Sequence, residues 1–140
     1  MAINVLVVDD SAVMRSIIIR TLRLSGLPLG KIYQAGNGAE GLQLLAQQRV
    51  DLALVDVHMP VMSGEEMIDR LRLSPATAHL PVVVISTEGG EGRVEQLRQK
   101  DVALLRKPFA PEALRATIDG VLGRLAPPSG GGQPWMGRDT

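Results

Sequence analysis

The chain has 140 residues, and its 15 Lys and Arg balance its 15 Asp and Glu, so the net charge is 0 at neutral pH. This length suits one domain with a real hydrophobic core, and the charge balance gives no support for a nucleic-acid partner. There is no cysteine, which excludes disulfides, thiolate metal ligands and thiol nucleophiles. No basic signal-peptide region precedes the first apolar run, and no run approaches the roughly 20 residues that span a bilayer. We therefore expect a soluble, cytoplasmic protein that binds neither membrane nor nucleic acid.

Five short apolar runs are separated by stretches long enough for a helix, and each has a polar residue at or near its C-terminal end. Four runs are nearly continuous in apolar residues, which is typical of strands covered on both faces. The second is mixed, as expected for an edge strand. The runs comprise residues 5–8, 31–35, 52–55, 82–85 and 102–106.

Between these runs the apolar residues recur at three- and four-residue spacing, the period of an amphipathic helix. Ser11 is a good N-cap for the first helix, and Pro111 suits the first turn of the last. The fourth predicted helix, residues 91–100, has little to bury and should be thinly anchored. The apolar stripes are Met14, Ile17, Ile18 and Leu22; Leu42, Leu45 and Ala46; Met67, Ile68 and Leu71; Val94 and Leu97; and Leu114, Ile118, Val121, Leu122 and Leu125.

Strands that alternate with helices predict parallel pairing through right-handed crossovers, and therefore an open, doubly wound α/β sheet. For five strand–helix units the expected order is 2-1-3-4-5, the flavodoxin-like arrangement. We expect this domain to comprise residues 1–125. Residues 126–140 hold three Pro and four Gly, which predicts a tail or a truncated linker.

Ligands of such sheets bind beyond the carboxyl ends of the strands, at the switch point between the first and the third. Polar side chains from four segments belong to that edge: Asp9, Asp10, Asp56, Ser86 with Thr87, and Lys107. The first strand–helix turn contains no glycine-rich phosphate loop, so a dinucleotide site is not expected.

Carboxylates within about 4–6 Å of one another repel by roughly 4 kcal/mol per pair at an effective dielectric of 20, so a cation has to offset them. Mg²⁺ suits, because it takes one or two carboxylates, keeps several waters and is completed by phosphate oxygens. Asp56 then has the geometry of a nucleophile that forms an aspartyl-phosphate. Lys107 would hold a phosphoryl oxygen, and the Ser86 hydroxyl would donate to another.

About residues 3–124 resemble the receiver domain of bacterial two-component response regulators, most closely the stand-alone chemotaxis type. Four motifs carry the resemblance in this order: VLVVDDS at 5–11, LVDVHMPVMSG at 54–64, VIS at 84–86 and KPF at 107–109. Each motif is weak alone, but all four at these spacings are specific.

The resemblance implies that Asp56 accepts phosphate from a sensor histidine kinase or a phosphotransfer protein. It assigns Mg²⁺ binding to Asp9 and Asp10 together with Asp56 and the backbone carbonyl of His58. It makes Lys107 the phosphoryl-binding cation and Ser86 the residue that reports the phosphoryl group. The Lys107–Pro108 peptide is cis in the family.

As a signalling receiver, the protein would have no enzymatic activity beyond Mg²⁺-dependent self-phosphorylation and self-dephosphorylation at Asp56. Its downstream target would dock on the face formed by the fourth helix, the fifth strand and the fifth helix. Chemotaxis is the expected pathway, because no DNA-binding module is present.

Two positions depart from the family pattern. Switching members carry an aromatic residue three positions before the lysine, where this chain has Leu104. We therefore expect phosphorylation to survive, with the readout altered or absent. His58, paired across the site with Glu88, is expected to affect dephosphorylation.

Other functions fit parts of the same pattern. Leu104 favours a phosphorylation-independent interaction module that keeps the fold without the switch. A Mg²⁺-dependent phosphohydrolase would need a second acid two residues after its nucleophile, where this chain has Ser11 or His58. The chain is also compatible with a receiver fragment of a larger regulator, in which Trp135 lies in a linker instead of serving as a docking anchor.

Purely structural interpretations remain for single residues. Asp10 or Ser11 would suffice as a helix cap, and Ser86 with Thr87 as turn hydroxyls. His79 is expected to be a solvated surface residue.

Overall fold

The computed structural model describes residues 2–56, 64–86, 102–107 and 109–125. Within these residues lies a five-stranded parallel sheet in the order β2-β1-β3-β4-β5, which confirms the predicted fold and strand order. The strands are β1 (Ile3–Val8), β2 (Leu29–Ala35), β3 (Leu52–Asp56), β4 (Val82–Ser86) and β5 (Ala103–Arg106). The helices are α1 (Ala12–Leu24), α2 (Gly38–Gln47), α3 (Gly64–Leu73) and α5 (Pro111–Leu125). The predicted helix at 91–100 and the predicted tail at 126–140 lie outside the described residues.

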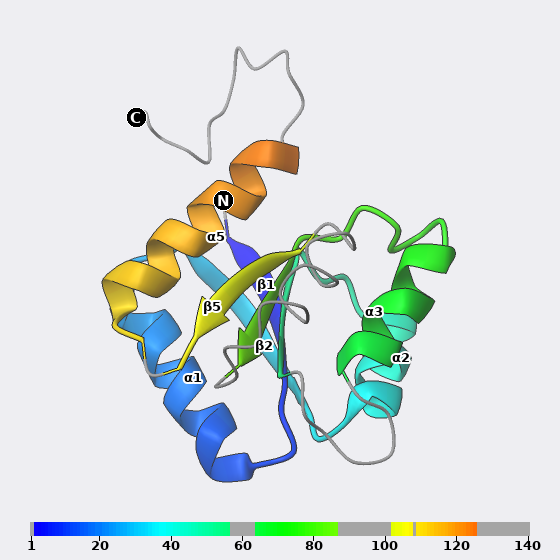
Figure 1. Cartoon of the computed structure of the whole chain (residues 1–140), viewed down its shortest axis with the longest axis horizontal. Helices are drawn as coiled ribbons and strands as arrows, with labels where there is room; N and C mark the ends of the chain where they lie inside the picture. The colour runs from blue at the N-terminus through cyan, green and yellow to red at the C-terminus, as the bar shows by residue number, and fades with distance from the viewer. Residues whose placement is uncertain (1, 57–63, 87–101, 108, 126–140) are drawn as a thin grey trace.

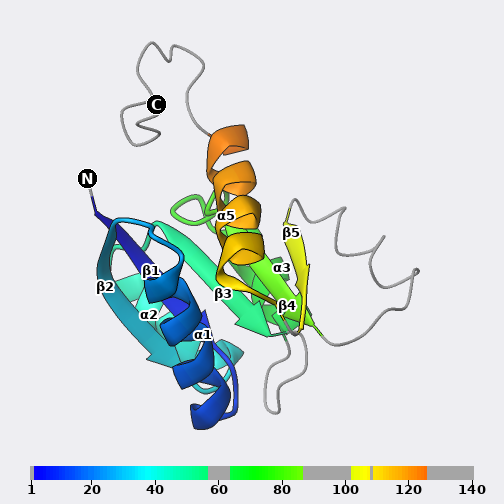
Figure 2. The ribbon, with the colours of Figure 1, turned by 90° about the vertical axis from the view of Figure 1, so that its left-hand side faces the viewer.

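Helices α1 and α5 cover one face of the sheet, and α2 and α3 cover the other (Figures 1 and 2). Successive strand residues point to opposite faces, so each strand contributes to two hydrophobic cores. In β1, Val5 and Val7 pack with α1 and α5, whereas Leu6 and Val8 pack with α3. This two-sided burial explains why the strand runs are nearly continuous in apolar residues.

The two edge strands differ from the central ones in burial. The mixed second run forms β2, and it lies at one edge of the sheet as predicted. The fifth run forms β5 at the other edge, where it is covered on both faces as predicted, with Leu104 packed against one core and Ala103 and Leu105 against the other. These three residues are only half-buried and Arg106 is exposed.

Most of the predicted helical stripes face the cores. In α1, Ile18 and Leu22 are buried and Met14 packs beside them. Ile17 does not belong to this stripe, since it is half exposed. Each helical residue advances about 100° around the axis, so Ile17 is turned away from Ile18 and the sheet. Ala46 of α2 is likewise exposed.

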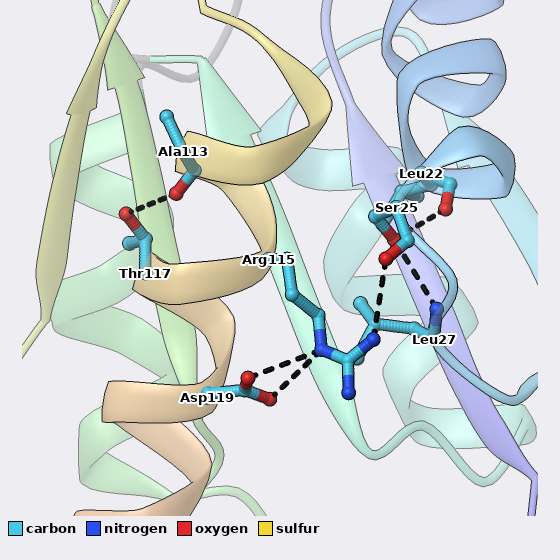
Figure 3. Close-up of polar contacts among 7 residues, drawn as sticks. All are labelled: Leu22, Ser25, Leu27, Ala113, Arg115, Thr117 and Asp119. Atoms are coloured by element: carbon cyan, nitrogen blue, oxygen red, sulfur yellow. Dashed lines mark hydrogen bonds and ion pairs between the residues drawn. The ribbon is translucent and has the colours of Figure 1, made fainter.

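The C-terminal end of α1 is held against α5 by one side chain. Arg115 Nη1 donates a hydrogen bond of 3.2 Å to the backbone carbonyl of Ser25, and its Nε donates to the carboxylate of Asp119 at 3.1 Å (Figure 3). Gly26 follows with a φ of 84°, a left-handed conformation that suits glycine. Arg115 thus gives a terminal carbonyl of α1 a charged donor.

In the part of the chain that the structure describes, no helix combines the length and the apolar character that crossing a bilayer would require.

Candidate functional site

The central strands bring two acidic residues to one edge of the sheet. Strand β1 pairs with β3 in parallel, with Val8 opposite Val55, so Asp9 follows one strand and Asp56 ends the other at the same edge. Both carboxylates are buried, with 1% of Asp9 and 8% of Asp56 exposed. Asp10 is exposed, and ligand oxygens of Asp9, Asp10 and Asp56 all lie within 4.8 Å of one another.

Lys107 supplies a positive charge to this cluster. It directly follows β5, the strand that pairs with β4, and its ammonium reaches back toward β1 and β3. The Nζ atom lies 3.6 Å from Asp9 Oδ2 and 3.9 Å from Asp56 Oδ1. The Lys107 ammonium therefore offsets part of the negative charge of the three clustered carboxylates.

The donor set fits a hard divalent cation. Asp9 Oδ1 accepts a hydrogen bond of 2.9 Å from the backbone N–H of Ser11. Asp9 Oδ2 is buried and accepts no hydrogen bond from any residue that the structure describes. Its charge faces the Lys107 ammonium at 3.6 Å, but a buried carboxylate oxygen normally also has a closer partner, and a metal ion would provide one here. The three carboxylates supply only oxygen ligands, which Mg²⁺ prefers.

Ser11 has a structural role at the same place. Its side-chain oxygen accepts a hydrogen bond of 3.1 Å from the backbone N–H of Met14, so it caps the N-terminus of α1 as predicted. This cap accounts for Ser11 and leaves the clustered carboxylates unexplained. The capping interpretation therefore does not replace the site.

Several predicted residues are placed only in part. Ser86 ends β4 opposite Arg106, at the sheet edge that carries Asp56, but its side chain is outside the description. His58, Thr87 and Glu88 lie outside the described residues, as do Pro108 and Trp135. Leu104 is half-buried and packs against the core on the side of α3. His79 is exposed, as expected.

Arg15 lies near the site although it is not among the predicted site residues. Arg15 Nη1 donates a hydrogen bond of 2.6 Å to the backbone carbonyl of Asp9. The sequence carried a signal for it, since a cation in the first turn of a helix opposes the helix dipole and calls for a compensating contact. That contact is with the loop that carries the acidic pair.

Comparison with known proteins gives a consistent result. The family model for the response regulator receiver domain matches residues 5–119. The chain is 34% identical over 122 residues to the chemotaxis protein CheY homolog of Campylobacter jejuni, covering 86% of this chain and 92% of that protein. It is also 34% identical over 120 residues to the sensor histidine kinase TmoS of Ectopseudomonas mendocina, covering 85% of this chain and 12% of the kinase.

The solved structures agree with this. The chemotaxis protein CheY4 of Vibrio cholerae superposes with a TM-score of 0.77 at 31% identity, covering 87% of this chain and 100% of that one.

Proposed function

The chain belongs to the response regulator receiver domain family, and on this basis we propose that it is a phosphorylation switch whose phosphoacceptor is Asp56. The observation that carries the proposal is the position of Lys107, whose ammonium lies within 4 Å of carboxylate oxygens of both Asp9 and Asp56. A cation in that place stabilises a phosphoryl group on Asp56 and repels none of its oxygens. The phosphorelay assignment also agrees with a relative that is a sensor histidine kinase.

The proposed step is a Mg²⁺-dependent transfer from a phosphohistidine donor to the carboxylate of Asp56. A carboxylate oxygen of Asp56 forms a bond to phosphorus while the P–N bond of the donor breaks. The electron pair leaves on the imidazole nitrogen, which takes a proton from solvent. Lys107 holds the phosphoryl oxygens during transfer, and the Ser86 hydroxyl is proposed to bind one of them afterwards. Hydrolysis of the acyl phosphate by water resets the switch, and self-phosphorylation and self-dephosphorylation at Asp56 are the only reactions that we propose.

A bound Mg²⁺ would be held by Asp9, Asp10 and Asp56, with the backbone carbonyl of His58 as a further proposed ligand. It would supply positive charge that screens the transferred phosphoryl oxygens from the carboxylates. The chain's own contribution is to hold Asp9 through the Ser11 N–H and to keep Lys107 beside it.

A protein phosphodonor has an exposed apolar surface available next to this site. Val13, Ile17 and Leu24 of α1 are 71%, 50% and 66% exposed. Their spacing places them on one face of a helix that begins two residues after Asp10. We assign this stripe to the sensor kinase or phosphotransfer protein, because an apolar face beside the acceptor holds the donor histidine close to Asp56. A Val13→Glu variant is expected to slow transfer from a phosphorylated protein donor and to leave transfer from acetyl phosphate unchanged.

The output surface is proposed to be the face of the fourth helix, β5 and α5, of which the fourth helix lies outside the described residues. Strand β5 ends directly before Lys107, and α5 begins four residues after it. With Leu104 in β5, the response has no aromatic side chain at that position to reorient. This favours a changed readout, and a phosphorylation-independent interaction module is the alternative. Chemotaxis is the proposed pathway, since relatives of similar length are chemotaxis proteins. The proposed receiver comprises residues 1–125 in the cytoplasm, followed by a tail or linker at 126–140.

The test is phosphorylation with a small donor. The full chain is incubated with Mg²⁺ and acetyl phosphate, and its intact mass is measured with and without EDTA. We expect one phosphoryl adduct on the wild type that disappears in Asp56→Asn and in EDTA. Asp119→Asn, which removes an exposed carboxylate of α5, is the matched control and keeps the adduct. A wild type without an adduct rejects the phosphoacceptor function and leaves the interaction module.

A further inference from the structure

Arg15 connects Asp9, the residue after β1, to Gln34 of the edge strand β2. It lies in the first turn of α1, four residues after the N-cap Ser11. Its Nη1 donates to the backbone carbonyl of Asp9 at 2.6 Å, and its Nε donates to Gln34 Oε1 of β2 at 3.0 Å. The planar guanidinium thus bridges the residue after β1 and the neighbouring strand, using two donors of one rigid group.

This place is unfavourable for a cation unless something compensates it. The first turn of α1 contains no acidic residue, and the positive end of the helix dipole disfavours a guanidinium there. The compensation comes from the Asp9 carbonyl and from the carboxylate cluster at the same end of the helix. Hydrogen bonds from a charged donor are short and strong, which agrees with the contact to Asp9.

The carbonyl that Arg15 holds belongs to the peptide bond between Asp9 and Asp10. Because a peptide group is planar, restraining this oxygen restrains the plane and the directions in which both side chains leave the backbone. Two other bonds hold Asp9 itself: its N–H donates to the Ala35 carbonyl at 3.1 Å, and its Oδ1 accepts from Ser11 N–H at 2.9 Å. The bond to Ser11 closes a turn around the Asp9–Asp10 peptide through the Asp9 side chain, and Arg15 adds a direct contact to the oxygen of that same peptide.

We propose that Arg15 is a positioning residue for the Mg²⁺ site, which acts by fixing the Asp9–Asp10 peptide and so presents both carboxylates to the ion. The inference rests on the proposed function, since it takes Mg²⁺ as the ligand of the cluster. Groups that orient metal ligands without touching the metal typically change affinity by 10- to 100-fold when they are removed. Arg15 performs this role through the backbone and not through a ligand side chain.

The experiment measures Mg²⁺ affinity of the full chain by isothermal titration calorimetry. Arg15→Ala is expected to weaken binding by about tenfold. Arg15→Lys keeps the charge but cannot reach both acceptors in the same fork, so its affinity should lie between those of the wild type and the alanine variant. Gln34→Ala, on the exposed side of β2, removes the second anchor and should give a smaller loss. Arg20→Ala removes an equal charge from an exposed position of the same helix and is the matched control, with unchanged affinity.

Thermal unfolding in EDTA identifies any variant that has lost its fold. If Arg15→Ala is unfolded, the Mg²⁺ affinity of Gln34→Ala is compared with that of the wild type instead. Wild-type affinity in Arg15→Ala would overturn the proposal, as would an equal loss in Arg20→Ala, which would reduce the effect to net charge. If the wild type itself binds no Mg²⁺, the metal site of the proposed function fails and this inference fails with it. The two failures are therefore distinguishable.

Discussion

Lys107 Nζ lies 3.6 Å from Oδ2 of Asp9, although the two residues come from opposite ends of the domain and from strands that do not pair with each other. The contact crosses β3 and β4, and Asp56 of β3 lies within reach of the same ammonium at 3.9 Å. An ammonium shared by two buried carboxylates suits a phosphoacceptor site. It balances the charge of Asp56 when that carboxylate is free and the charge of the phosphoryl group when Asp56 carries one.

Replacing Lys107 separates metal binding from phosphoryl binding. Lys107→Ala keeps all three carboxylates, so Mg²⁺ affinity should be nearly unchanged. The rate of phosphorylation by acetyl phosphate should fall by about 100-fold, the cost of removing one electrostatic contact to a reacting group. Lys107→Arg, which keeps the charge, is the comparison. Equal loss of metal binding and phosphorylation in Lys107→Ala would contradict the assigned role.

Asp10→Asn tests whether the clustered carboxylates destabilise the metal-free fold. The exposed Asp10 carboxylate has a ligand oxygen within 4.8 Å of those of Asp9 and Asp56, so its neutral isostere should raise the metal-free stability by up to about 1 kcal/mol, the value expected for a well-solvated pair. The gain should shrink in high salt, which screens exposed charges. Thermal unfolding in EDTA at low and high ionic strength measures both effects. A lower midpoint in the variant would speak against repulsion within the cluster.

Removing Mg²⁺ should lower the stability of the wild-type chain. A ligand that binds only the folded state adds about 2.7 kcal/mol when its concentration is 100 times its Kd. Urea unfolding with Mg²⁺ and with EDTA gives this difference, and Ca²⁺ in place of Mg²⁺ tests for selectivity. Asp9→Asn should lose most of the difference, because it neutralises a proposed ligand. An Asp9→Asn chain that Mg²⁺ stabilises as much as the wild type would remove Asp9 from the site.

Gly41 and Met67 should show energetic coupling across the contact between α2 and α3. A Cβ at Gly41 would lie 2.9 Å from Cε of the buried Met67 and 3.2 Å from Cγ2 of Val8. Gly41→Ala should therefore destabilise by about 1 kcal/mol, since overpacking outweighs the helix propensity that alanine gains. In a Met67→Ala background the same substitution should become neutral or stabilising. A double-mutant cycle in urea measures the coupling, and additive effects would refute the close packing.

Arg115 should matter more to stability than the partner in its ion pair. Arg115→Ala removes the donor to the Ser25 carbonyl as well as the contact with Asp119, and it should cost about 1 kcal/mol. Asp119→Ala removes only an exposed pair on α5 and should cost no more than about 0.5 kcal/mol. Equal losses from the two variants would show that the link to α1 in Figure 3 contributes nothing.

The strands, the helices and the cap at Ser11 could be predicted because their causes are local. Hydrophobic period and capping chemistry depend on residues a few positions apart. The order of the strands follows because parallel crossovers allow few topologies. Asp9 and Asp56 could be assigned to one edge of the sheet for the same reason: each stands at the C-terminal end of a predicted strand.

The burial of individual residues at the periphery of the fold could not be predicted from the sequence, because it depends on which helices and strands cover them. Ile17 has the spacing of a core residue but faces solvent, and β5 has an apolar sequence but lies at an edge.

From the sequence by itself came the alternation of strands and helices, the family motifs and the residue types at the strand ends, since these depend on local pattern. Only the tertiary structure decided that Lys107 lies between Asp9 and Asp56, and that Arg15 reaches back to the Asp9 carbonyl and across to Gln34. The physical reason is that long cationic side chains have many rotamers. The three-dimensional arrangement of acceptors selects one of them, and spacing along the chain does not record that arrangement.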